Sequence, residues 1–126
     1  ISLGKQKTLE LGALEPKRDW GFAGDYVEAM WLMLQQKEAS DFVVATGENH
    51  SVREFIDIAF KAVGITDWSK LVISNKSFHM RPAEVDYLIG DATRARKILG
   101  WKPKTSFGQL VEMMIKADLE LEKREK

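Results

Sequence analysis

The sequence predicts a small mixed α/β fold with short strands and about four helices, and three patterns carry that prediction. Ser51–Glu54 and Ser106–Gln109 have the Ser-x-x-Glu/Gln spacing of capping boxes, which open helices. The run Phe42–Thr46 is almost wholly apolar, which is typical of a strand buried on both faces of a parallel sheet. Thr8–Leu11 alternates and is β-prone, as expected of a short strand.

The first third of the chain is expected to contain two strands and a helix. After Thr8–Leu11, a turn leads into a second short strand, Lys17–Ala23. A helix should then run from about Asp25 to Gln36, with Asp25 as its N-cap. Its buried side is predicted from the apolar residues at helical spacing, which are Val27, Met30, Trp31 and Leu34.

The rest of the chain should alternate further between strands and helices. The predicted elements are a strand Phe42–Thr46, a helix Val52–Val63, a strand Leu71–Ser74, a loop His79–Asp86, a short helix capped by Asp91 and ending near Leu99, and a last helix from Phe107 to about Glu122. The apolar stripe of that last helix comprises Phe107, Leu110, Val111, Met114, Ala117, Leu119 and Leu121. We interpret all four tryptophans as packing residues. The strands are too few for a complete doubly wound sheet, so a further part of the polypeptide is expected to supply one.

Composition limits the classes of function. The 126 residues are 44% hydrophobic and 30% charged, which fits one soluble globular domain. Zero net charge argues against nucleic acid as the main partner, because phosphate binding usually needs a basic excess. The N-terminus has no secretory signal and no apolar run could span a membrane, so we expect a cytoplasmic protein with no membrane partner. The missing initiating methionine suggests that residues are missing upstream.

No motif for catalysis, cofactor binding or metal binding is present. The chain lacks a Gly-x-Gly-x-x-Gly loop, a P-loop and a Gly-x-Ser-x-Gly elbow. The two histidines, His50 and His79, have no metal-ligand spacing, so we expect no metal site. Neither Tyr26 nor Tyr87 is followed four residues later by lysine, which excludes a tyrosine–lysine proton-transfer pair within this chain.

The remaining candidates are binding residues. Pro82 stiffens the loop that carries Arg81 and Glu84, and biases Arg81 towards an extended conformation. A guanidinium held in this way can grip a diphosphate, and a nearby carboxylate can accept hydrogen bonds from the hydroxyls of a ribose. A surface ion pair between Arg81 and Glu84 explains the same residues equally well. Arg18 and Asp19 are either a second binding group or a pair that satisfies local backbone groups.

The motifs also resemble a known family, the GDP-mannose 4,6-dehydratases, which are extended short-chain dehydrogenases/reductases with a Rossmann fold. The resemblance covers essentially the whole chain in order. The segments that carry it are Lys17–Gly21, Asp25–Trp31, Ala45–Glu48, His50–Phe55, Arg81–Asp86, Gly90–Asp91 and Leu99–Pro103.

The resemblance implies an activity and a division of labour. The family forms GDP-4-keto-6-deoxymannose from GDP-mannose, on the route to GDP-fucose, with a tightly held NADP. Its Gly-rich cofactor loop and catalytic groups lie in an N-terminal half that this sequence lacks. Residues 1–126 would be the substrate-binding domain, in which Arg18 and Arg81 meet the diphosphate region and Glu84 meets the ribose of GDP. The full-length form would be a homo-oligomer, a dimer or a tetramer.

Two other readings remain open. The chain could belong to the related NADPH-dependent reductase that acts on the 4-keto product and shares a similar Arg-Pro loop. It could also be a non-catalytic module that binds nucleotide sugars or serves in assembly. As part of a dehydratase, the 126 residues alone are expected to be inactive, because the catalytic groups lie upstream. They are also expected to bind the nucleotide sugar weakly or not at all, because a pocket between two domains has only one wall here.

Overall fold

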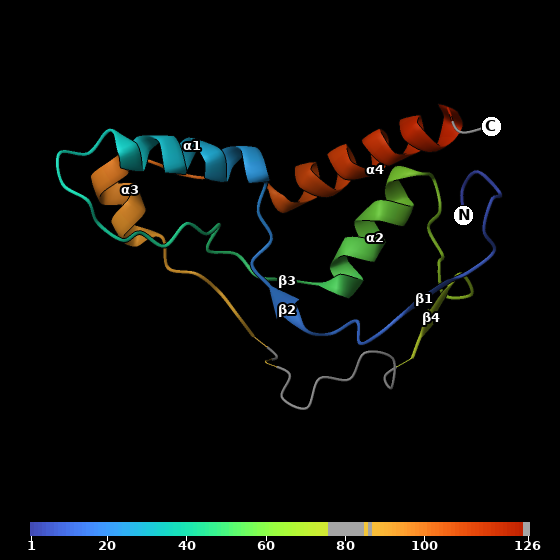
Figure 1. The fold of residues 1–126 in the computed structure, drawn as a ribbon. Coiled ribbons are helices and arrows are strands. Elements are labelled where there is room, and N and C mark those ends of the chain that lie inside the picture. The colour runs from blue at the N-terminus through green and yellow to red at the C-terminus, as the bar shows by residue number, and fades with distance from the viewer. Residues whose placement is uncertain (76–84, 86, 125–126) are drawn as a thin grey trace.

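The computed structural model describes residues 1–75, 85 and 87–124, and these form four helices and four short strands (Figure 1). In chain order they are β1 Leu9–Leu11, β2 Lys17–Arg18, α1 Ala23–Leu34, β3 His50–Ser51, α2 Val52–Ala62, β4 Val72–Ser74, α3 Thr93–Leu99 and α4 Phe107–Arg124. The predicted mixed α/β class with short strands and four helices is confirmed for this part of the chain. None of the helices described is long and apolar enough to cross a bilayer.

The helices pack in two groups that lie side by side in Figure 1, with α1 on α3 and α2 on α4. Each group has its own cluster of buried side chains. The first cluster consists of Ala29, Ala45, Ala92, Ala95, Leu99 and Trp101. The second, formed under α2, consists of Leu14, Ile56, Phe60 and Val72. Buried side chains at the start of α4, among them Phe107 and Val111, add to the packing beside α2.

Two small sheets hold the connecting segments. In the first, β1 pairs in parallel with β4, so that Leu9 lies opposite Val72. In the second, β2 pairs antiparallel with β3, and Arg18 lies opposite His50. The predicted strands at 8–11 and 71–74 are therefore confirmed. The strand predicted at Lys17–Ala23 is confirmed only at Lys17–Arg18, and these two residues pair with the two residues of β3.

Local sequence signals located several helix ends but not the start of α3, where the N-cap is Ala92 and not the predicted Asp91; Asp91 lies one residue earlier and accepts a hydrogen bond from the Thr93 N–H. Ser51 caps α2, and the reciprocal bond from its backbone N–H to Glu54 completes the predicted capping box. The second box is also present, since the Ser106 N–H donates to Gln109 and the Gln109 N–H donates to the Ser106 hydroxyl. α3 ends at Gly100, whose φ of +66° lies in the left-handed region that favours glycine.

Asp25 is not the N-cap of α1, contrary to the prediction. The helix begins at Ala23 after Phe22, and no side chain caps it. Asp25 is instead buried and accepts hydrogen bonds from the backbone N–H groups of Lys104 and Thr105, at 3.0 and 2.9 Å. Sequence spacing alone could not reveal this partner, because it lies 79 and 80 residues away in the chain.

The buried side predicted for α1 is wrong. Val27, Met30, Trp31 and Leu34 are exposed, whereas the helix packs through Ala29 together with Tyr26, Leu32 and Met33. Apolar residues occupy both sides of α1, so helical spacing alone could not identify the side that packs within this chain. Trp31 is accordingly not a core residue here, unlike the fully buried Trp101.

Two further predictions, the strand at Phe42–Thr46 and the buried stripe along the whole of α4, are wrong for the described part of the chain. Phe42–Thr46 forms no strand, since no segment in the described part pairs with its backbone. The apolar stripe of α4 is buried only as far as Val111, and Met114 and Leu121 are exposed. Most of the loop predicted at His79–Asp86 lies outside the described residues.

Candidate functional site

Arg18 lies at the centre of the candidate site. Its position at the end of β2 places it opposite His50 of β3. The Nη1 group of Arg18 donates to the carbonyl oxygen of Lys17 at 2.7 Å and to that of Val85 at 2.6 Å. Val85 directly follows Glu84 in the sequence. The guanidinium is therefore hydrogen-bonded to a residue 67 positions further along the chain.

Asp19, the next residue, links its own segment by hydrogen bonds to two others, Thr46–Gly47 and Gly90. One carboxylate oxygen accepts from the backbone N–H and the hydroxyl of Thr46, at 2.9 and 2.6 Å. The other accepts from the N–H groups of Gly47, at 2.9 Å, and Gly90, at 3.4 Å. Partial burial by itself raises the pKa of Asp19, but the hydrogen bonds from Thr46, Gly47 and Gly90 outweigh it and lower the pKa below its usual value. Asp19 is thus held as a carboxylate.

Trp20 extends the corner into an aromatic cluster. Its indole N–H donates to the carbonyl oxygen of His50 at 2.9 Å, and its ring lies 5.4 Å from that of Phe55. The imidazole of His50 stacks on Phe107 with the ring centroids 4.0 Å apart. The Nδ1 atom of His50 lies 3.1 Å from the Glu54 carboxylate. We call Arg18, Asp19, Trp20, Thr46 and His50 the Arg18 corner.

Tyr26 packs behind this corner and is not suited to act as a base. Its ring lies so close to Gly21 that a side-chain carbon added at Gly21 would overlap it. Burial raises the pKa of Tyr26, and the negative charges of Asp19 and Asp25 raise it further. The ionised phenolate is therefore disfavoured.

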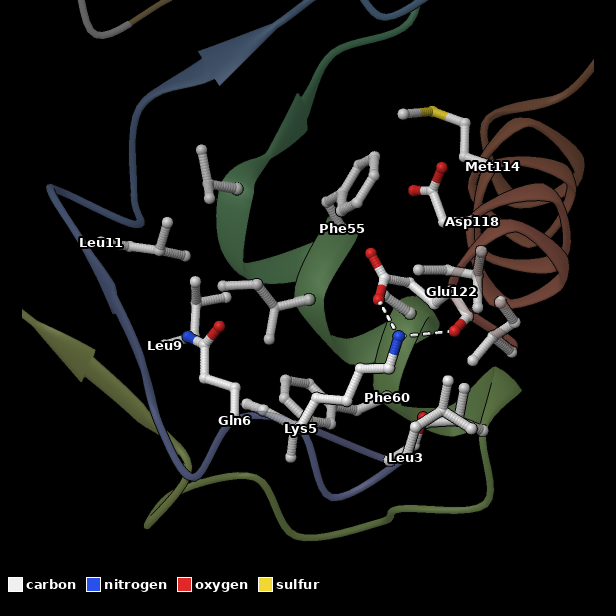
Figure 2. A pocket seen from close by; sticks show the side chains of 18 of the residues that line it. Leu3, Lys5, Gln6, Leu9, Leu11, Phe55, Phe60, Met114, Asp118 and Glu122 are labelled. Atoms are coloured by element: carbon white, nitrogen blue, oxygen red, sulfur yellow. Dashed lines mark hydrogen bonds and ion pairs between the residues drawn. The ribbon is translucent and has the colours of Figure 1, made fainter. Parts of the chain in front are cut away.

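Trp20 also separates two cavities. The larger, of about 610 Å³, lies between the N-terminal segment, α2 and α4, and Figure 2 shows Leu9, Leu11, Phe55 and Phe60 on its walls. Lys5 and Glu122 form an ion pair of 2.7 Å at its rim (Figure 2). The smaller cavity, of about 210 Å³, is more polar and is lined by Thr46, His50, Lys104 and neighbouring residues. Arg18 is not among the residues that line these two cavities.

The predicted binding residues therefore have different outcomes. Arg18 is located, and its hydrogen bonds to the carbonyl oxygens of Lys17 and Val85 are given above. Arg81 and Glu84 lie outside the described residues, and their roles stay predictions. The view that Asp19 satisfies backbone groups agrees with its contacts, but those groups belong to distant segments. Sequence reasoning assigned no role to Thr46 and His50, although the position of Thr46 at the end of an apolar run was a usable signal.

The sequence matches known proteins over its length. A family model described as GDP-mannose 4,6 dehydratase matches residues 1–114. GDP-mannose 4,6 dehydratase 1 of Arabidopsis thaliana is 56% identical over 126 residues, which are the whole of this chain and 34% of that protein. The human GDP-mannose 4,6 dehydratase is 46% identical over 136 residues, covering 96% of this chain and 37% of its own length. The chain thus spans about a third of the length of these relatives.

Solved structures share the fold. RMD from Pseudomonas aeruginosa, solved with NADPH, superposes with a TM-score of 0.78 and 24% identity, covering 91% of this chain and 37% of that one. UDP-glucose 4-epimerase from Thermotoga maritima, solved with UDP-glucose, gives 0.77 and 22% over 90% and 35%. The predicted fold class, a small mixed α/β portion of the extended short-chain dehydrogenase fold, is confirmed.

Proposed function

Because the chain belongs to the GDP-mannose 4,6-dehydratase family, we propose that it is part of an enzyme that converts GDP-mannose to GDP-4-keto-6-deoxymannose and water. The observation that carries this proposal is the family match over residues 1–114, which includes the entire Arg18 corner. The Arabidopsis and human relatives, at 56% and 46% identity, bear the name of the same activity.

The role proposed for residues 1–126 is to bind the nucleotide sugar. In this role Arg18 and Arg81 contact the diphosphate region, and Glu84 contacts the GDP ribose. The contact of Arg18 with Val85 supports the proposal, because it fixes a permanent positive charge at the residue that follows Glu84 in the sequence.

NADP does not fit this chain, so we propose that another part of the enzyme binds it. A dinucleotide site needs a Gly-rich turn between a strand and a helix, and the sequence has no such turn. The two sheets in the described part, β1–β4 and β2–β3, have two strands each, whereas such a site is built on a larger parallel sheet. The NADPH in the related RMD structure supports the cofactor assignment for the whole enzyme.

The remaining parts of the proposal rest on the family resemblance. We propose that the full enzyme is a homo-oligomer in the cytoplasm, and that an N-terminal Rossmann domain precedes the present residues. We use "the longer polypeptide" for the gene product that contains this sequence together with the additional length of its relatives.

Product analysis tests the function. The longer polypeptide is incubated with GDP-mannose and NADP, and the nucleotide sugar is analysed by mass spectrometry. Formation of the 4-keto-6-deoxy product, with loss of one water, supports the proposal. If GDP-mannose stays unchanged and the polypeptide instead reduces a supplied 4-keto sugar with NADPH, the protein is the reductase and not the dehydratase. Turnover of GDP-mannose by residues 1–126 alone would contradict the division of labour.

A binding measurement addresses the non-catalytic alternative. Isothermal titration of residues 1–126 with GDP and with GDP-mannose should give weak or no binding, because one wall of the pocket is present. Tight binding by this chain, together with an inactive longer polypeptide, would favour a binding module instead.

A further inference from the structure

A short stretch of main chain lies along β2 and is held there through its backbone. Its described residues are Val85 and 87–90, and we call them the 85–90 strip. The carbonyl oxygen of Val85 accepts a hydrogen bond from Nη1 of Arg18 at 2.6 Å. Tyr87 forms a parallel β-bridge with Lys17. The strip is thus attached to β2 at both of these positions by its main chain.

Asn49 holds the same strip from the side of the neighbouring strand. Its side-chain amide nitrogen donates to the carbonyl oxygen of Leu88 at 2.8 Å. Asn49 directly precedes His50, the residue of β3 that lies opposite Arg18. Arg18 and Asn49 therefore bind carbonyl groups of one strip, at positions 85 and 88 of the chain.

The side chains that precede Gly90 in the strip give it little support. They are about half exposed, at 50%, 58%, 51% and 45% for Val85, Tyr87, Leu88 and Ile89. A segment that buries little apolar surface opens locally at a low cost in free energy. Hydrogen bonds to its main chain, including those from Arg18 and Asn49, are therefore important for keeping the strip in place.

The amide of Asn49 carries a cost in stability. Its Oδ1 atom is buried and accepts no hydrogen bond from any residue that the structure describes. A buried acceptor without a donor is unfavourable, and a leucine, which has a similar shape, would avoid it. A leucine could not supply the N–H that binds the Leu88 carbonyl. The donation to Leu88 therefore accounts for an amide at this position.

We propose that Asn49 is a positioning residue for the guanidinium of Arg18. By holding the carbonyl group of Leu88, Asn49 keeps the strip in place, and the strip presents the Val85 carbonyl that fixes Nη1 of Arg18. A guanidinium recognises a diphosphate through a planar fork, so its orientation as well as its charge determines the affinity. This inference rests on the proposed function and deepens it, because it names the residue that orients the proposed diphosphate-binding group.

Hydrogen exchange of the longer polypeptide, followed by mass spectrometry, tests the hold on the strip. In Asn49→Leu, the amides of 87–90 should exchange about tenfold faster than in the native protein, because one attachment of the strip is removed. The amides of β1 and β4 serve as the internal control and should be unchanged. Equal exchange at 87–90 in the native protein and the variant would overturn the inference.

Steady-state kinetics test the consequence for the substrate. Asn49→Leu should raise the KM for GDP-mannose about fivefold and change kcat by less than about twofold, because a binding group is misoriented while no catalytic group is altered. Its melting midpoint should not fall, since the substitution also removes the buried, unpaired oxygen. A purely structural role for Asn49 would instead lower the melting midpoint and leave the KM unchanged, and that result would overturn the inference.

Asn75→Leu is the matched control. The side-chain amide of Asn75 donates to the carboxylate of Glu10 at 3.2 Å, beside the β1–β4 pair. This variant also loses an amide contact between two segments, but not one that involves the strip, so its KM should equal that of the native protein. An equal rise in KM for Asn75→Leu and Asn49→Leu would overturn the inference.

A double-mutant cycle shows whether Asn49 acts through Arg18. In the Arg18→Ala background, Asn49→Leu should change the KM by less than about 1.5-fold, because the group that it positions is no longer there. A full fivefold effect in that background would contradict the positioning role. Asn49→Ala, which needs less space than leucine, is the second variant and should reproduce both the rise in KM and its dependence on Arg18. Failure to reproduce them would also overturn the inference.

The two proposals can fail separately. A native longer polypeptide that leaves GDP-mannose unchanged would refute the proposed function, whereas the exchange of 87–90 would still show whether Asn49 holds the strip. An active enzyme whose KM is unaffected by Asn49→Leu would refute the positioning role alone.

Discussion

The carboxylate of Asp19 holds Thr46 by two hydrogen bonds at once, one from its backbone N–H at 2.9 Å and one from its hydroxyl at 2.6 Å. Asp19→Asn should lower the free energy of unfolding by roughly 2 kcal/mol, because hydrogen bonds to a charged acceptor are lost. The amide nitrogen of asparagine would also face the N–H groups of Gly47 and Gly90 as a second donor. Urea unfolding at neutral pH measures this difference.

The same pair predicts a pH dependence. The pKa of Asp19 is lower in the folded chain than its ordinary value of 3.8. A lowered folded-state pKa means that its contribution to stability is complete above the unfolded value and is lost as the pH falls through the folded one. The difference between the native chain and Asp19→Asn should therefore be constant down to about pH 5 and shrink below about pH 4. A difference that grows on acidification would contradict this account.

Asp25 offers a sharper contrast between two substitutions. Asp25→Ala should cost about 3 kcal/mol, since it leaves the N–H groups of Lys104 and Thr105 without their acceptor in a buried position. Asp25→Asn keeps a carbonyl oxygen that can accept both bonds, so its cost should be below about 1 kcal/mol. Urea midpoints of the two variants, compared directly, check the prediction. Equal costs would show that charge matters here more than the acceptor.

The close contact between Gly90 and Ala45 predicts that a second substitution can restore stability lost in the first. Gly90→Ala should destabilise the chain by about 3 kcal/mol, because the new carbon would lie 2.2 Å from the Ala45 side chain. In the double variant Gly90→Ala with Ala45→Gly, the nearest remaining neighbour is Val43 at 3.4 Å, which a small adjustment accommodates. Most of the lost stability should return in a double-mutant cycle. Additive effects of the two substitutions would rule out the direct clash.

Arg18 predicts a change in substrate affinity. In the longer polypeptide, Arg18→Ala should raise the KM for GDP-mannose about tenfold or more with a smaller effect on kcat, because it removes a binding contact. Arg18→Lys should be intermediate, since lysine keeps the charge but not the planar fork. Arg94→Ala is a suitable control, because Arg94 lies on the exposed side of α3. Steady-state kinetics with all three variants would separate a specific role from a general loss of charge.

Arg81 gives a parallel prediction that depends on the family resemblance alone. Arg81→Ala in the longer polypeptide should raise the KM for GDP-mannose strongly, as expected for a group that grips the diphosphate. An unchanged KM would remove Arg81 from this role. Thermal melting of the variant checks that the protein remains folded.

The parts of the fold that sequence predicted well are those fixed by local chemistry. The capping box at Ser51 and Glu54 located the start of α2 because both partners lie within one helical turn. Gly100 located the end of α3 because few other residues tolerate its backbone conformation. Such signals need no knowledge of distant segments.

The failures share one cause, which is dependence on partners far away in sequence. The buried side of α1 was misassigned because both of its sides are apolar, and only packing on Ala92 and Ala95 decides between them. The run at Phe42–Ala45 has the composition of a strand, but a strand also needs a neighbour. Asp25 looked like a cap because its partners at 104 and 105 were not visible in the local sequence.

The candidate site shows the same division. The motif that contains Arg18 was recognised from its residues, and the structure adds the contact with Val85. The arrangement of Asp19 with Thr46, Gly47 and Gly90 could not be derived from the sequence, because these residues come from three separate segments.

The parallel pairing of β1 with β4 has a consequence for how the chain folds. Leu9 cannot meet Val72 until the intervening residues, which include α1 and α2, have been brought into a closed loop. Closing a long loop lowers the chain entropy before the favourable contact can form, so chains rich in such distant contacts fold slowly. Lys5 and Glu122, 117 residues apart, meet over an even longer loop. The capped helix α2 can form early from local contacts, and the β1–β4 ladder should be the late, rate-limiting step.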